Sequence, residues 1–204
     1  VSMKSGLGDR NNVAEALGRS AAGLALLSAG MDNAPGLQDA APGGQKQPEA
    51  WACIEAFRAP TPPLTAGREL ALTGATSMLD VSDGLLRDAG RIAHASGVVI
   101  DLVDPDDLPD ASFLEPVAVL VSGHDGSAAR ELARSWLLTG GEDHGLLATI
   151  PADALERLPA EARIIGRVLS PQSSPARVLR HRPGVLLAGE LAQEHSGWDH
   201  FSHT

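Results

Sequence analysis

The sequence is poor in aromatic side chains and in cysteine. Aromatic residues make up 3% of its 204 residues, and tyrosine is absent. Hydrophobic residues still reach 43%, so we expect a packed core built from Ala, Leu, Val and Ile. This hydrophobic content argues against global disorder. Cys53 is the single cysteine, which excludes an intramolecular disulfide and a zinc site with several cysteine ligands.

Positive charge is also scarce. Lys and Arg number 16 against 26 Asp and Glu, which gives a formal net charge of −10. A protein that binds nucleic acid without sequence preference needs a basic face, so no nucleic-acid partner is expected. An anionic substrate would need metal ions or a local basic group. Since no apolar run approaches the roughly 20 residues that cross a bilayer, we expect no membrane partner and a soluble, cytoplasmic protein.

Helical and strand patterns alternate along the chain. Helices are predicted where apolar residues recur about one turn apart, and strands where short apolar runs occur. The predicted helices are 14–29, 49–58, 83–96, 126–137 and 151–158, and the predicted strands are 75–81, 98–103, 144–150, 163–169 and 176–182. The Pro/Gly-rich segment 31–48 is predicted to be a flexible loop. This alternation favours a layered α/β or α+β domain.

Carboxylates crowd the junction between a predicted strand and a predicted helix, in the stretch SMLDVSDGLLRD (77–88). One interpretation is structural: Ser82 caps the helix, Asp83 interacts with the helix dipole, and Asp88 pairs with Arg91. That interpretation leaves Asp80 unexplained. Two converging carboxylates, Asp80 and Asp83, repel each other unless a cation lies between them. A hard cation such as Mg²⁺, which bridges carboxylates and substrate phosphates, is the second interpretation.

The segment MLDVSDGLLRDAGRIAHASGVVIDL (78–102) resembles the carboxyl-terminal half of thiamine-monophosphate kinases. That family carries an Asp-x-Ser-Asp-Gly-Leu motif followed by an Asp and a Ser-Gly-Val. Three more segments match in order: LGRSAAGLALL (17–27), TGGEDHGLLAT (139–149) and GWDHF (197–201). The fold implied by this resemblance is α+β: a three-layer domain with a mixed sheet, like the carboxyl-terminal domain of aminoimidazole ribonucleotide synthetase.

The resemblance implies a transfer of the γ-phosphoryl group of ATP onto the phosphate of thiamine monophosphate. Such chemistry depends mostly on positioning and on charge neutralisation by Mg²⁺, without a covalent intermediate. The resemblance further implies roles for individual side chains. It implies that Mg²⁺ is bound by Asp80 and Asp83, and that ATP is contacted by Arg19 and Ser82. It also implies that thiamine monophosphate is bound by Glu142 and Trp198. From the sequence alone, Phe201 rivals Trp198 as the aromatic residue against the substrate.

The match is to one half of the family pattern. Family members begin with another half that carries a Gly-Asp-Asp motif and binds metal and nucleotide. Residues 1–12 are therefore expected to be a remnant of the inter-domain segment, and residues 13–204 the carboxyl-terminal domain. The chain alone is expected to be inactive, and the full-length family is expected to be homodimeric. The alternatives are a non-catalytic ligand-binding module and another ATP-dependent enzyme of the same superfamily.

Overall fold

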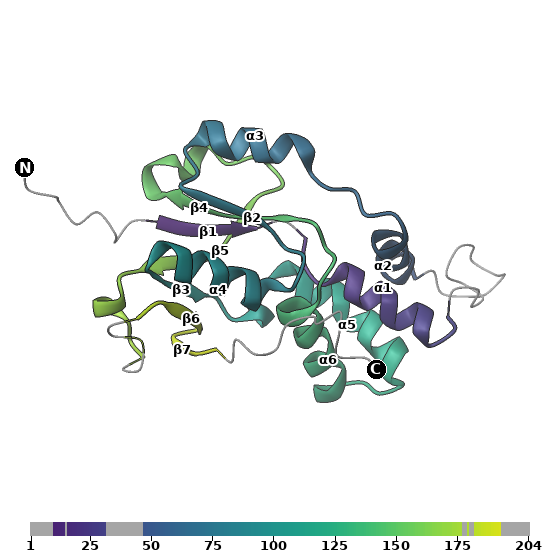
Figure 1. Ribbon diagram of the computed structural model, residues 1–204. Coiled ribbons are helices and arrows are strands. Elements are labelled where there is room, and N and C mark those ends of the chain that lie inside the picture. The colour runs from purple at the N-terminus through teal and green to yellow at the C-terminus, as the bar shows by residue number, and fades with distance from the viewer. Residues whose placement is uncertain (1–9, 15, 32–46, 177–178, 180–181, 193–204) are drawn as a thin grey trace, which may run out of the picture.

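A mixed sheet of seven strands forms the centre of the molecule (Figure 1). The computed structural model describes residues 10–14, 16–31, 47–176, 179 and 182–192. The strands are β1 (Arg10–Ala14), β2 (Ser77–Asp80), β3 (Val99–Leu102), β4 (Leu146–Pro151), β5 (Arg163–Leu169), β6 (Gly184–Leu187) and β7 (Glu190–Leu191). Their order is β2-β4-β1-β5-β3-β6-β7. Only the pairing of β3 with β6 is parallel among these strands. The predicted mixed sheet is thus confirmed.

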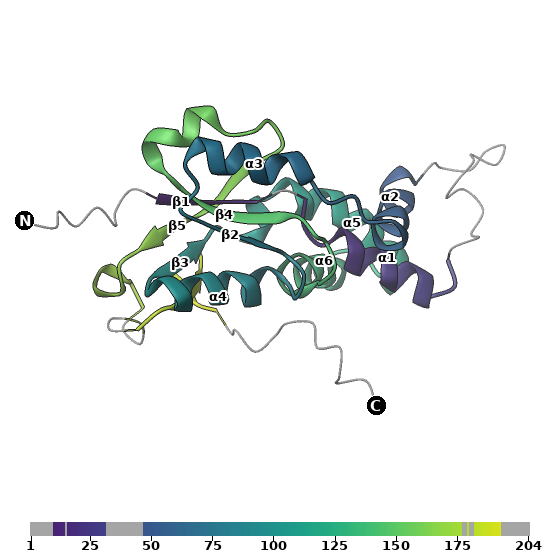
Figure 2. The same ribbon diagram turned by 45° about the horizontal axis from the view of Figure 1, so that its top comes forward.

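Helices lie on both sides of this sheet and beyond one of its ends. They are α1 (Arg19–Ser28), α2 (Pro48–Arg58), α3 (Leu64–Thr73), α4 (Leu85–Ser96), α5 (Pro109–Ser122) and α6 (Ser127–Thr139). Figures 1 and 2 show α3 and α4 on opposite sides of the sheet, with α1, α2, α5 and α6 grouped at one end. The described helices are thus mixed with strands in the α+β manner that the sequence predicts. None of the described helices has both the length and the hydrophobicity needed to span a membrane.

The main core joins α4 and the helical group to one face of the sheet. Ile100 and Ile165 on the strands and Leu137 on α6 are completely or almost completely buried in it. The predicted apolar face of α4 is confirmed, because Leu85 and Ile92 are both buried. A smaller cluster under α3 covers the other face near β4. The core consists mainly of aliphatic side chains, as the scarcity of aromatic residues requires.

Several predicted boundaries differ from the structure. The predicted helix at 14–29 begins only at Arg19, and Arg10–Ala14 form strand β1 between β4 and β5. Strand β1 thus crosses the expected division between residues 12 and 13. The predicted helix at 151–158 is a short 3₁₀ helix, Ala152–Arg157. The predicted strand at 176–182 and the loop at 31–48 lie largely outside the described residues.

Two helices escape the sequence patterns. The segment that becomes α3 follows a run of prolines, and α5 contains Pro116, which normally argues against a helix interior. Strands β6 and β7 were also not predicted. Tertiary packing overrides weak local propensity here, because the buried residues of α5, Leu114 and Val117, belong to the main core.

Candidate functional site

The acidic junction is an irregular connection between β2 and α4. Helix α4 begins at Leu85, so Ser82 and Asp83 precede it and the prediction that Ser82 caps this helix is wrong. The residue at the cap position is Gly84, whose φ of 104° few other residues adopt. A Cβ there would also lie 2.8 Å from the carbonyl oxygen of Thr139. Gly84 therefore allows the junction to pass close to the end of α6.

The carboxylate of Asp88 holds the junction in place. Its Oδ2 accepts hydrogen bonds from the backbone N–H groups of Ser82 (3.1 Å) and Asp83 (3.0 Å). The guanidinium of Arg91 donates to Asp88 Oδ1 at 2.6 Å and also pairs with Asp83. The predicted pairing of Asp88 with Arg91 is confirmed. Because the Asp88 side chain is completely buried, desolvation raises its pKa, although both backbone hydrogen bonds act in the opposite direction.

The Gly-Gly-Glu-Asp segment forms a loop, defined here as residues 140–145, that lies beside this junction. The N–H of Glu142 donates to the carbonyl oxygen of Ser82 at 3.0 Å, and the N–H of His144 donates to that of Val81 at 3.0 Å. Glu142 and His144 have φ values of 65° and 54°, which are uncommon for residues other than glycine. The carboxylate of Glu142 lies 3.1 Å from Nε2 of His144. Two segments far apart in the sequence thus form one structural unit.

The start of α1 is bound to the same loop. Asp143 accepts hydrogen bonds from the N–H groups of Gly18 (2.5 Å) and Ser20 (3.0 Å). The hydroxyl of Ser20 donates to the carbonyl oxygen of Glu142 at 2.7 Å. These bonds satisfy donors at the first turn of a helix, which has no partners of its own for them. Burial raises the pKa of Asp143 to about 6 and outweighs the two hydrogen bonds, which lower it.

Arg19 lies between Gly18 and Ser20 at the start of α1. Its guanidinium lies over the ring of Phe113, 4.3 Å from the ring centroid. Arg19, Ser20 and Asp143 line a pocket of about 490 Å³ between α1 and α2. The structure therefore places Arg19 next to the loop at residues 140–145, without a contact to Ser82 among the described interactions.

The two carboxylates predicted to bind metal have different surroundings. Asp80 is exposed at the end of β2 and lines a pocket of about 390 Å³ with His144 and residues of the α3 segment. Asp83 is mostly enclosed and paired with Arg91. In the described part of the chain, no group of three or more His, Cys, Asp or Glu side chains could hold a metal ion. Trp198 and Phe201 lie outside the described residues.

Sequence reasoning missed the hydrogen bonds that hold this unit together, including those of Asp88 to the backbone of the junction. Asp143 and Ser20 join the loop to α1, and Asp88 joins the junction to α4. A signal for Asp143 was present, because the residue follows Glu142 directly and a helix start at Gly18–Arg19–Ser20 needs acceptors for its free N–H groups. No local pattern shows that the acceptor for these N–H groups is Asp143, more than 120 positions further along the sequence.

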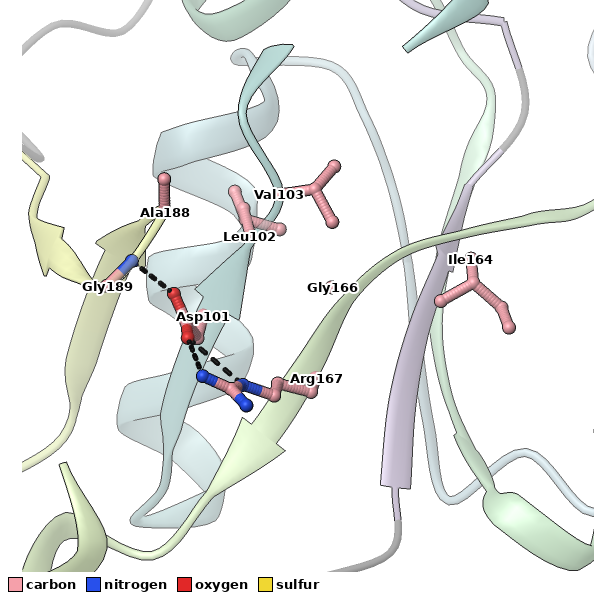
Figure 3. A pocket seen from close by; sticks show the side chains of 8 residues that line it. All are labelled: Asp101, Leu102, Val103, Ile164, Gly166, Arg167, Ala188 and Gly189. Atoms are coloured by element: carbon pink, nitrogen blue, oxygen red, sulfur yellow. Dashed lines mark hydrogen bonds and ion pairs between the residues drawn. The ribbon is translucent and has the colours of Figure 1, made fainter. Parts of the chain in front are cut away.

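A further pocket, of about 370 Å³, lies on the sheet away from these loops (Figure 3). Figure 3 shows the carboxylate of Asp101 between the guanidinium of Arg167 and the N–H of Gly189. Arg167 donates to one oxygen of Asp101 through two nitrogens, at 3.1 and 2.8 Å, and Gly189 donates to the other oxygen at 2.9 Å. Among the residues that the structure describes, no predicted site residue lines this pocket.

Comparisons with known proteins place these residues in a family context. No family model matches the chain. The thiamine-monophosphate kinase of Mycobacterium tuberculosis (strain H37Rv) is 36% identical over 190 residues, which cover 91% of this chain and 44% of that protein. The enzyme of the same name from Corynebacterium glutamicum is 36% identical over 188 residues, covering 91% of this chain and 46% of that protein.

Solved structures show the same similarity. The structure of AaThiL complexed with AMPPCP and TMP superposes with a TM-score of 0.68 at 28% identity, covering 96% of this chain and 52% of that one. The thiamine-monophosphate kinase of Stenotrophomonas maltophilia K279a gives a TM-score of 0.61 at 31% identity, over 91% of this chain and 52% of that one. The chain spans about half the length of these relatives.

Proposed function

Because this chain is homologous to thiamine-monophosphate kinases over 91% of its length, we propose that it is the carboxyl-terminal half of such an enzyme. In this proposal the complete protein transfers the γ-phosphoryl group of ATP directly to thiamine monophosphate and forms thiamine diphosphate. The three-layer arrangement of the superfamily's carboxyl-terminal domain, a homodimer and a cytoplasmic location are parts of the same proposal.

The contact between Ser82 and Glu142 is the observation that carries this function. The family resemblance assigns Ser82 to ATP and Glu142 to thiamine monophosphate. The two residues are held together by a backbone hydrogen bond of 3.0 Å. Direct phosphoryl transfer needs donor and acceptor held side by side, because positioning supplies much of the rate enhancement. Binding of AMPPCP and TMP to the related AaThiL supports the same pair of ligands.

The carboxylates at the junction suit a hard cation. Mg²⁺ is commonly held by one or two carboxylates together with substrate phosphates and water. Asp80 is exposed at a pocket, and Asp83 lies three residues further along the junction. We propose that these two side chains hold Mg²⁺, which neutralises charge when two phosphorylated molecules meet. Asp83 would exchange its pairing with Arg91 for the ion.

Two further assignments complete the proposal. Arg19 lines the pocket next to Asp143 and would contact an ATP phosphate by rotating its guanidinium away from Phe113. Trp198 would place an aromatic face against the cationic heterocycle of thiamine monophosphate.

The test is a phosphorylation assay with the full-length protein that contains this chain. We expect thiamine diphosphate to form from ATP and thiamine monophosphate, and we expect the 204-residue chain alone to form no appreciable amount. In the full-length protein, Glu142→Gln should raise KM for thiamine monophosphate about tenfold and leave KM for ATP within twofold, because one charge facing a cationic substrate is lost. The absence of product with the full-length protein would refute the proposed function.

A further inference from the structure

One carboxylate joins the loop that carries Glu142 to the start of α1. The oxygens of Asp143 accept the N–H groups of Gly18 and Ser20, at 2.5 and 3.0 Å. The hydroxyl of Ser20 also donates to the carbonyl oxygen of Glu142 at 2.7 Å. Because three hydrogen bonds join the two segments, the loop at residues 140–145 cannot shift relative to α1 without breaking several of them at once.

The conformation of the loop makes such support necessary. Glu142 and His144, the residues on each side of Asp143, both have positive φ. Residues other than glycine are strained at positive φ, and such conformations persist where the surrounding structure holds them. The bonds from Glu142 and His144 to the junction hold one side of the loop. Asp143 and Ser20 hold the other side.

The surroundings of Asp143 are unfavourable for a charge. Burial raises its pKa to about 6, and the nearby Asp110 acts in the same direction, whereas Arg19 opposes it. A carboxylate at this position therefore costs free energy that a neutral side chain would not. What the carboxylate supplies in return is two acceptor oxygens for two N–H groups on the same helix start. An asparagine offers a single acceptor oxygen and places an NH₂ donor where the second N–H points.

Resting on the proposed function, we propose that Asp143 is a positioning residue for the thiamine-phosphate subsite. It fixes the loop at residues 140–145 against α1, so that the carboxylate of Glu142 remains where the substrate binds. Asp143 acts through the backbone of its neighbour, and its removal changes the affinity for one substrate more than it changes the chemical step.

Asp110 provides a matched control. It is a buried carboxylate in the first turn of α5, where it accepts the N–H of Leu17, directly before α1, at 3.2 Å and pairs with Arg163. It makes no hydrogen bond to the loop at residues 140–145 among those recorded for it. Asp110→Asn therefore loosens the same helix start without releasing Glu142.

The first experiment measures amide hydrogen exchange by NMR in the 204-residue chain. In Asp143→Asn we expect the amides of Ser20 and Glu142 to exchange at least tenfold faster than in the unsubstituted chain. In Asp110→Asn the amide of Leu17 should exchange faster, while that of Glu142 stays within twofold. An unchanged rate at Glu142 in Asp143→Asn would overturn the inference. This readout does not depend on whether the protein is a kinase.

The second experiment measures steady-state kinetics of the full-length protein with each substrate varied in turn. Asp143→Asn should raise KM for thiamine monophosphate about tenfold, with kcat within threefold and KM for ATP within twofold. Ser20→Ala leaves Asp143 in place and removes the hydroxyl that donates to the carbonyl oxygens of Glu142 and, more weakly, Ala56. It should raise the same KM about threefold, which keeps the test valid if Asp143→Asn fails to fold. An equal rise in Asp110→Asn, or no rise in either Asp143→Asn or Ser20→Ala, would overturn the inference.

A full-length protein without kinase activity would refute the proposed function, and the exchange result would then decide the inference alone.

Discussion

Carboxylates with backbone and side-chain partners occur in two parts of this molecule, on the sheet and at the loops, and their sets of partners differ. On the sheet, Asp101 is 6% exposed and lies against the guanidinium of Arg167, a side chain that is itself 63% exposed. At the loops, Asp88 accepts the backbone N–H groups of Ser82 and Asp83, which directly precede its own helix. The half-buried Asp143 accepts those of Gly18 and Ser20, which are far away in the sequence. The carboxylate of Asp101 is bound by an exposed guanidinium and by one backbone N–H, that of Gly189. Asp88 and Asp143 each accept two backbone N–H groups of the segments whose positions they determine, and Asp88 also pairs with Arg91.

The difference has a physical consequence. When Asp101 is removed, the exposed guanidinium of Arg167 can rotate toward the solvent and form hydrogen bonds with water. The loss of this partner therefore costs little free energy. The N–H groups of Ser82 and Asp83 cannot turn away, because their directions are fixed by the backbone. Removal of Asp88 or Asp143 should therefore lower the free energy of unfolding more than removal of Asp101 does. It should also disturb the loops that carry the proposed site.

The largest effect is expected for Asp88→Ala. This change leaves the N–H groups of Ser82 and Asp83 without their acceptor and separates Arg91 from a buried partner, so the free energy of unfolding should fall by about 3 kcal/mol. Asp101→Ala is the matched change on the sheet and should cost about 1 kcal/mol, mostly for the N–H of Gly189. Urea denaturation followed by circular dichroism measures both. Equal losses would remove the distinction between the two kinds of carboxylate.

The next effect concerns pH and Asp143. Its pKa is raised from 3.8 to about 6 in the folded chain, so the folded state binds a proton more tightly than the unfolded state does. The resulting stabilisation is fully present below about pH 4 and is lost as the pH rises through about 6. The shift corresponds to at most about 3 kcal/mol. Asp143→Asn should therefore flatten the decline in stability between pH 4 and pH 7, as measured by denaturant titration at several pH values. Ser20→Ala, which leaves the carboxylate in place, should retain that decline.

Local patterns predicted much of the secondary structure but little of this network. The face of α4, its end at Gly97, and strands β3, β4 and β5 follow from hydrophobic spacing, which short segments encode by themselves. The Asp88–Arg91 pair follows from helical spacing as well. The start of α4 was misplaced because Ser82 is a good cap by composition, while the close approach of Gly84 to Thr139 is a tertiary contact.

The candidate site was predicted only as far as a family resemblance reaches. That resemblance assigns roles to Ser82 and Glu142, which stay predictions, and a backbone hydrogen bond joins these two residues in the structure. It did not identify Asp143, whose role depends on bonds to residues 125 and 123 positions away in the sequence. Contacts of that separation leave no periodic signal in a single sequence, since neither segment changes its local pattern to accommodate the other.

A smaller effect in free energy, but a larger one in activity, is expected at Asp80. This side chain is exposed and lines a pocket, so Asp80→Asn should change the free energy of unfolding by no more than about 0.5 kcal/mol. In the full-length protein it should lower kcat at saturating Mg²⁺ more than tenfold, because a proposed metal ligand is lost while the side-chain shape is kept. Asp101→Asn should leave kcat within twofold. An unchanged kcat in Asp80→Asn would mean that the acidic junction serves only to connect β2 with α4.

The smallest effect is expected for Arg167→Ala, which tests the sheet pair from its exposed side. The guanidinium donates two hydrogen bonds to one oxygen of Asp101, yet more than half of its surface faces water. Solvent screening and side-chain entropy reduce the value of such a pair, and water can reach the oxygen that Arg167 leaves. The N–H of Gly189 keeps the other oxygen bonded. The free energy of unfolding should therefore fall by less than about 1 kcal/mol, measured by urea denaturation. In the full-length protein, KM for both substrates should stay within twofold, since the pocket is lined by none of the proposed site residues that lie in the described part of the chain. A loss of stability as large as that of Asp88→Ala would contradict the view that water can replace Arg167 as the partner of Asp101. A change in either KM would extend the functional site to this face of the sheet.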